Sequence, residues 1–114
     1  MAIASIYGKN SLAAKYAAEA AYGALYTTVP GASAGSEVAG GTPAYARKPL
    51  SWSAPASGVI TASAVFDIPA GTTVLGSGVH TAATGGSYVD GKAEEAASFP
   101  IQDTVTVTFT FTEV

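Results

Sequence analysis

The sequence predicts a mainly β protein: a single antiparallel β-sandwich, jelly-roll or immunoglobulin-like, with an N-terminal arm that contains a short helix. Three observations lead to this class. From residue 43 onward, glycine and proline turn signals recur at short intervals, which is typical of sandwiches and barrels. Residues 104–112 alternate strictly between threonine and a larger apolar residue. Residues 10–21 have the composition of a helix.

The arm is predicted to cover residues 1–25 and the β-sandwich domain residues 26–114. Within the arm, residues 10–21 are rich in alanine, and Asn10 and Ser11 are both suitable N-caps. A helix of this length is marginal on its own in water. We therefore expect it to dock on the domain or on a neighbouring chain.

The domain is predicted to contain short strands separated by loops. A β-like stretch at residues 21–28 is stopped by Pro30. Residues 30–42 are rich in glycine and predict a long loop whose only charged residue is Glu37. The candidate strands after this loop are 45–53, 58–68, 73–80, 87–90 and 104–113.

The last strand has the clearest local pattern. Threonine holds the even positions of 104–112, and the odd positions hold Val105, Val107, Phe109 and Phe111. Successive side chains point to opposite faces, so one face is apolar and the other is a threonine ladder. A long, uncharged strand of this kind would promote aggregation if its edge stayed open. We expect it to lie in the centre of the sheet or to pair with another chain.

Composition excludes several classes of function. The chain has no cysteine, so it has no thiolate nucleophile, cysteine-based zinc site or disulfide framework. A net charge of −3 without a basic cluster argues against nucleic acid as a partner. No targeting or membrane segment is evident, and we expect a chain made in the cytoplasm, with no membrane partner. Charged residues make up only 11%, which suits close packing against neighbouring subunits.

No constellation of residues predicts catalysis, metal binding or cofactor binding. His80 stands at the end of a candidate strand without an Asp and Ser arrangement around it, which favours a structural role. Asp67, Asp90 and Asp103 fall on separate turns and do not form a calcium-loop pattern. We therefore expect a protein that is not an enzyme. Trp52 is expected to anchor the core.

Partner contacts are expected on the arm, on the loop around Glu37 and at the basic pair Arg47 and Lys48. That pair has two interpretations: it meets an acidic or aromatic partner surface, or it protects an edge strand from pairing with another sheet. Both stay open at this point. The predicted contact residues are Ile3, Ile6, Tyr7, Leu12, Tyr16, Glu37, Arg47 and Lys48.

Several motifs follow one another in a recognisable order. They are EVAGG at 37–41, PAYARKPLSW at 43–52, FDIPAGTTV at 66–74, TAATGGSY at 81–88 and a closing strand that begins TVT at 104. In this order they resemble a group of small virion proteins of tailed phages of actinobacteria. Members of that group are labelled head-decoration, tail-fibre-like or minor tail proteins.

The resemblance implies a bacteriophage virion structural protein on the particle surface, without catalytic residues. The favoured function is a capsid decoration protein bound to the major capsid lattice. Its partners would be the major capsid protein or other virion subunits, and it would form a homo-oligomer, for which a trimer is one option. The alternative is a tail-fibre or minor tail protein that binds the host surface, with tyrosines such as Tyr22, Tyr26, Tyr45 and Tyr88 offering stacking faces to a glycan. A third hypothesis is a small hydrolase that uses His80 with an acid.

Overall fold

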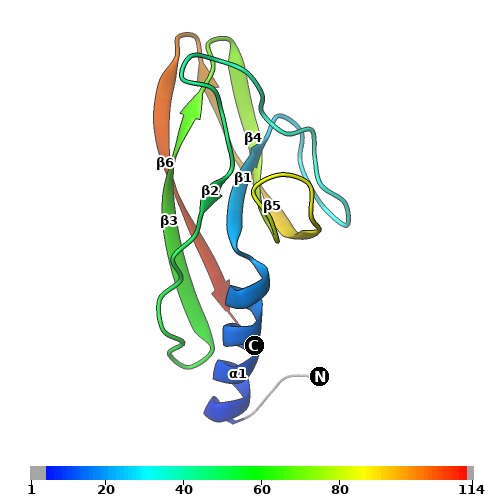
Figure 1. Cartoon of the computed structure of the whole chain (residues 1–114), viewed down its shortest axis with the longest axis vertical. Helices are drawn as coiled ribbons and strands as arrows, with labels where there is room; N and C mark the ends of the chain where they lie inside the picture. Colours follow the sequence, from blue (N-terminus) through cyan, green and yellow to red (C-terminus); the bar gives the residue numbers. More distant parts are fainter. Residues whose placement is uncertain (1–4, 113–114) are drawn as a thin grey trace.

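In the computed structural model, which describes residues 5–112, two antiparallel β-sheets form two layers and one helix continues the long axis (Figure 1). The molecule is elongated, measuring 47 × 23 × 23 Å. The predicted β-sandwich with an N-terminal helix is confirmed. The elements in chain order are α1 (Ile6–Glu19), β1 (Tyr22–Tyr26), β2 (Lys48–Pro49), β3 (Val59–Ile68), β4 (Thr72–His80), β5 (Tyr88–Phe99) and β6 (Asp103–Thr112).

The larger sheet has four strands in the order β2-β1-β4-β5. Strand β1 pairs with β4 along its whole length, from Tyr22 opposite His80 to Tyr26 opposite Gly76. Its other edge is covered by β2 and, further along, by residues 36–38, where the Val38 amide donates to the Leu25 carbonyl at 3.1 Å. Strand β1 thus runs across the predicted arm–domain boundary at 25/26, and that division stays a prediction.

The smaller sheet consists of β3 and β6, paired without interruption from Val59 opposite Thr112 to Ile68 opposite Asp103. Among residues 5–112 no strand pairs with the second edge of β6, so the expectation that this strand is central in its sheet is wrong. The pattern of its side chains is as predicted. Phe109 is buried and its apolar neighbours are half-buried, whereas the threonines are exposed.

The core lies between the two sheets, where β1, β3, β4 and β6 meet. Tyr26, Phe66 and Leu25 are its largest fully buried side chains, and the ring of Phe66 meets that of Phe109 edge to face at 6.3 Å. Trp52 is only half-buried, at the margin of this cluster. Its indole N–H donates to the Ala20 carbonyl at 2.7 Å, so it fastens the end of the helix rather than the centre of the core.

The helix begins earlier than the sequence predicted. Ser5 is the N-cap, and its Oγ accepts from the Gly8 amide at 3.0 Å. Asn10 and Ser11 lie inside α1 instead, and the Asn10 Oδ1 accepts from the Gly58 amide at 2.8 Å. The helix end at Glu19 agrees with the predicted end at residue 21 to within the usual uncertainty of helix boundaries.

Two strand predictions also change. Strand β5 extends to Phe99 rather than ending at residue 90, because pairing with β4 overrides a local sequence rich in Lys, Glu and Ala that is typical of helices. The predicted strand 45–53 is reduced to Lys48–Pro49, since proline has no amide to donate to a ladder.

Candidate functional site

Three of the predicted contact residues are exposed on α1. Ile6 is 60% exposed, Tyr7 83% and Leu12 44%, and Ala13 is the one residue of the helix that is fully buried. Ile3 lies outside the described residues. At 100° per residue, Ile6, Tyr7 and Leu12 point in different directions around the helix, so they are separate exposed apolar side chains and not one patch.

Tyr16, also predicted as a partner contact, packs within its own chain. Its ring stacks on Phe111 with centroids 4.0 Å apart and meets Trp52 edge to face at 5.8 Å. Its hydroxyl lies 3.4 Å from the Asp90 carboxylate. Burial, followed by the nearby charge of Asp90, raises the pKa of Tyr16 well above its ordinary value, so the ring stays neutral.

Glu37 and Arg47, predicted separately as partner contacts, are brought together in one ion pair. The guanidinium donates to both carboxylate oxygens, with Nη2 2.9 Å from Oε1 and Nε 3.0 Å from Oε2. Tyr45 donates to the same carboxylate at 2.8 Å, and its hydroxyl accepts from the Leu25 amide at 3.0 Å. The side chain of Arg47 is only 12% exposed, so its charge is met mainly inside the chain.

This ion pair ties three loops to the four-stranded sheet. Arg47 Nη1 also donates to the carbonyls of Ala82 and Gly85, at 3.1 and 2.9 Å. Burial by itself raises the pKa of the Glu37 carboxyl, but the hydrogen bonds from Arg47 and Tyr45 outweigh it and hold that pKa below its usual value. The bidentate Glu37–Arg47 pair therefore holds the loops in position on the sheet. That Glu37 and Arg47 also contact a partner stays a prediction. A shallow groove of about 360 Å³ lies beside it.

Lys48, the eighth predicted contact residue, lies apart from this pair. Its ammonium is 3.8 Å from the Asp67 carboxylate and about one third exposed. An ion pair this long and this exposed contributes little to stability.

His80 is buried and forms a hydrogen bond with the Tyr26 hydroxyl through Nε2. Its ring also meets the ring of Tyr88 edge to face at 5.6 Å. Burial and the charge of Arg47 lower the pKa of His80, against a smaller opposing effect of Glu37. The hydrogen bond fastens β4 to β1, and within residues 5–112 no carboxylate is hydrogen-bonded to His80. The structural role that the sequence favoured for His80 stays a prediction.

The side of the sandwich between β5 and β6 is open. Here a groove of about 210 Å³ has Leu25, Val74 and Phe99 on one wall and Val105 and Val107 on the other. No residue of β5 is fully buried, since the two-stranded sheet covers only part of the four-stranded one.

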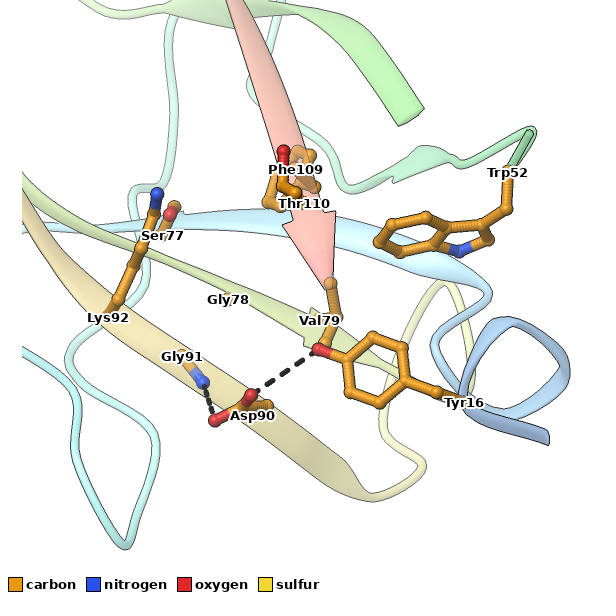
Figure 2. A pocket seen from close by; sticks show the side chains of 10 residues that line it. All are labelled: Tyr16, Trp52, Ser77, Gly78, Val79, Asp90, Gly91, Lys92, Phe109 and Thr110. Atoms are coloured by element: carbon orange, nitrogen blue, oxygen red, sulfur yellow. Dashed lines mark hydrogen bonds between the residues drawn. The ribbon is translucent and has the colours of Figure 1, made fainter. Parts of the chain in front are cut away.

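A second, smaller pocket of about 60 Å³ continues this open side toward the helix. Figure 2 shows Tyr16 and Trp52 on one side of this pocket, Phe109 and Thr110 together on β6, and the Tyr16 hydroxyl pointing toward Asp90 on β5. The two pockets share no lining residue and lie one after the other along β5 and β6. We call the larger of these two the β5–β6 cleft.

The outer edge of β6 borders this cleft and has free backbone groups. The Thr61 amide and carbonyl on β3 both bond to Ser53, so Thr61 is not hydrogen-bonded to the residue opposite it, Thr110. Bonding and non-bonding positions alternate in an antiparallel pair. The even residues of β6 therefore direct their amides and carbonyls outward. Consistently, the Thr104 amide bonds to the side chain of Asp103 and not to β3.

The sequence predicted strand β6 but not the open side between β5 and β6. The threonine pattern predicted that β6 needs cover on both edges, and within residues 5–112 only β3 pairs with it. No sequence signal indicated that β5 would face β6 across a cleft, because most of β5 was read as something other than a strand. Within residues 5–112, no group of three acidic or histidine side chains is arranged to hold a metal ion, and no helix is long and apolar enough to span a bilayer.

The cleft, the second edge of β6 and the exposed side chains of α1 are surfaces that residues 5–112 leave uncovered. A comparison with protein families gives one match. The model for "Podophage GP4 fiber I protein gp80" matches residues 9–113. The chain therefore belongs to this family of phage fibre proteins. Neither the curated proteins nor the solved structures contain a match.

The family confirms the coarser part of the expectation from the sequence, that this is a structural protein of a phage virion. It is a fibre family, and it lends no support to a decoration protein of the head. That the phage infects actinobacteria stays a prediction, as does the role of each predicted contact residue.

Proposed function

We propose that this chain is a structural subunit of a phage tail fibre and that its role is assembly and contact rather than catalysis. The observation that carries this proposal is the fibre-family match over residues 9–113. Of the two virion functions considered from the sequence, it favours the fibre over the capsid decoration protein.

The geometry supports an assembly role. The sandwich is elongated, and α1 lies at one end with Ile6 and Tyr7 exposed (Figure 1). The Glu37–Arg47 pair fastens the loops to the sheet, so the surface presented to other virion subunits is rigid. Rigid surfaces lose little conformational entropy on association, which favours stable interfaces.

Copy number and position in the particle test this function. Quantitative mass spectrometry of purified virions, calibrated against the major capsid protein, should give tens of copies per particle or fewer. Antibody-linked gold should label the tail region in electron micrographs. Hundreds of copies with label spread over the head would overturn the fibre proposal and favour a decoration protein.

A further inference from the structure

We propose that the outer edge of β6 binds an extended segment of a different protein chain, whose inward side chains are basic where they pass Glu94 and Glu95 and apolar elsewhere. The segment would add a third strand to the β3–β6 sheet and cover the β5–β6 cleft. The proposal concerns the folded chain itself and does not depend on where the protein sits in the virion.

Strand β6 offers an unused backbone edge. The outward amides and carbonyls of Thr106, Thr108 and Thr110 have no hydrogen-bond partner within residues 5–112. The strand pairs with β3 over ten residues without a register shift, so this edge is regular. A row of free amides and carbonyls binds an added strand through the same hydrogen bonds that hold a sheet together.

The added strand would lie over the inner side of β5. In Figure 1, β6 and β3 lie together along one side of the molecule, with β4 and β5 in the other layer. Val74 and Phe99 line the cleft on the side of the larger sheet. Apolar side chains on the inward face of the added strand would cover them, and burial of apolar surface favours association.

Strand β5 also brings two neighbouring carboxylates to this cleft. Successive side chains of a regular strand point to opposite faces, but the pairing of β4 with β5 is shifted between Val74 and Gly76, and Glu94 and Glu95 both line the cleft. Glu94 lies 3.3 Å from the exposed ammonium of Lys92, and among residues 5–112 no cation lies within 4 Å of the Glu95 carboxylate. Covering these carboxylates without a positive charge is costly, so the occupant carries basic side chains here.

The chain direction gives the order of basic and apolar positions along the cleft. Strand β5 ends at Phe99 and β6 begins shortly after, at Asp103, so the two strands run in opposite directions (Figure 1). Val105 therefore lies toward Phe99, and Val107 lies toward the two glutamates. A matching segment has an apolar side chain opposite Val105 and a basic one opposite Val107.

A second copy of β6 does not fit this description. Residues 104–112 carry no charge to meet Glu94 and Glu95, and a two-fold pair of β6 strands would bring the larger sheets of the two copies into the same space. A single extended segment brings no second layer with it. Its backbone supplies affinity and its alternate side chains supply specificity.

A synthetic peptide of sequence TVTKTKTVT, with acetylated and amidated ends, tests the proposal. Its inward face has two lysines between two valines, and it reads the same in both directions. In an NMR titration of the full chain it should bind with a dissociation constant below about 1 mM. The outward amides of Thr106 and Thr108 should become protected from exchange, and the amide of Ser63 on the outer edge of β3 should not. No saturable change on β6, or a change confined to β3, would overturn the proposal.

Changes of charge test the basic character of the occupant. The matched peptide TVTETETVT should bind at least about tenfold more weakly, because its carboxylates face Glu94 and Glu95. The double variant Glu94→Lys with Glu95→Lys should reverse this preference. Glu19→Lys, on α1 outside the cleft, should leave the preference unchanged. Equal affinity for the two peptides, or a reversal by Glu19→Lys, would contradict a basic occupant.

Backbone methylation of the peptide tests strand pairing without altering the protein. An N-methyl group on the central threonine removes an amide that would donate to β6, so affinity should fall about tenfold, the equivalent of one hydrogen bond. An N-methyl group on a neighbouring lysine, whose amide would point away from β6, should have less effect. Equal effects would overturn the pairing. A chain that sediments as a dimer without peptide, with its outward β6 amides protected, would assign this edge to a second copy instead.

Discussion

The ring of Tyr16 on α1 lies stacked on the ring of Phe111 near the end of β6, with centroids 4.0 Å apart and planes 17° from parallel. This contact joins the N-terminal helix to the last strand, two parts of the chain that are far apart in sequence. The helix is too short to be stable alone, so contacts such as this one decide whether it is formed.

Tyr16→Ala should therefore lower the free energy of unfolding by about 2 kcal/mol, less than for a fully buried ring because Tyr16 is half-buried. Urea unfolding followed by circular dichroism measures it. Tyr16→Phe is the control: it keeps the stacking and loses only the long 3.4 Å contact with Asp90, so its effect should stay within about 0.5 kcal/mol. If both variants were equally destabilised, the stacking would not be the stabilising interaction.

Arg47→Ala should cost about 3 kcal/mol, because it leaves the partly buried Glu37 carboxylate without its cation and frees the carbonyls of Ala82 and Gly85. Lys48→Ala, the next residue along the chain, is the matched control, and its 3.8 Å ion pair should be worth less than about 0.5 kcal/mol. Chemical denaturation of both variants compares them directly. Similar losses would mean that the network around Glu37 is not what holds the loops.

Stability should fall in acid in two stages. Burial and the charge of Arg47 hold the pKa of His80 in the folded chain below its ordinary value of 6.5. As the pH falls below about 6.5, His80 therefore takes up a proton in the unfolded chain before it does so in the folded chain, and the free energy of unfolding decreases. One proton gives a slope of at most about 1.4 kcal/mol per pH unit. Glu37 follows: hydrogen bonds from Arg47 and Tyr45 lower its pKa, so its contribution is complete above its ordinary 4.5 and is lost as the pH falls further.

Urea unfolding at a series of pH values from about 8 to about 2 measures both stages. His80→Gln should be less stable at about pH 8, since it disturbs the bond to Tyr26, but should lack the first stage. A wild-type curve that stays flat down to about pH 5 would show that His80 is not held in its neutral form.

Gly23→Ala should destabilise the fold by about 2 kcal/mol. A Cβ at this position would lie 2.8 Å from Cζ of Phe109 and 3.2 Å from Cδ2 of Leu50, so the core would have to shift. Gly31→Ala is the control, since a Cβ there meets no atom within 4 Å and should change stability by less than about 0.5 kcal/mol. Thermal unfolding of the pair distinguishes overpacking from a general cost of replacing glycine.

The exposed side chains of α1 should matter for assembly and not for folding. The double variant Ile6→Ser with Tyr7→Ser should leave the unfolding free energy within about 0.5 kcal/mol of wild type, because both side chains are mainly exposed. Its incorporation into virions, measured against wild type in a complementation assay, should fall severalfold. Normal incorporation would remove α1 from the proposed assembly surface.

The fold class and the last strand could be predicted because they depend on local patterns. The alternation from Thr104 to Thr112 specifies which side chains enter the core, whatever lies opposite. Strand β5 could not be predicted, because Lys92 to Ala97 has the composition of a helix and becomes a strand only through pairing with β4. The start of α1 was missed because Ser5 caps it earlier than the alanine-rich stretch suggests.

The surfaces were predictable only in part. Glu37 was predicted as the only charge of a long loop and Arg47 as half of a basic pair with Lys48, but nothing in their spacing indicated that Glu37 and Arg47 bind each other. The need of β6 for cover followed from the sequence. That it has β3 on one edge but no second neighbour within residues 5–112, and that its other edge borders a cleft, depends on how the two sheets are layered.

Amide hydrogen exchange along β6, resolved by residue with NMR, tests the central claim that the outer edge of this strand is free within its own chain. The inward amides of Val105, Val107 and Phe109, which face β3, should be protected, and the outward amides of Thr106, Thr108 and Thr110 should exchange rapidly. Outward amides that are protected in the monomeric chain would contradict the account.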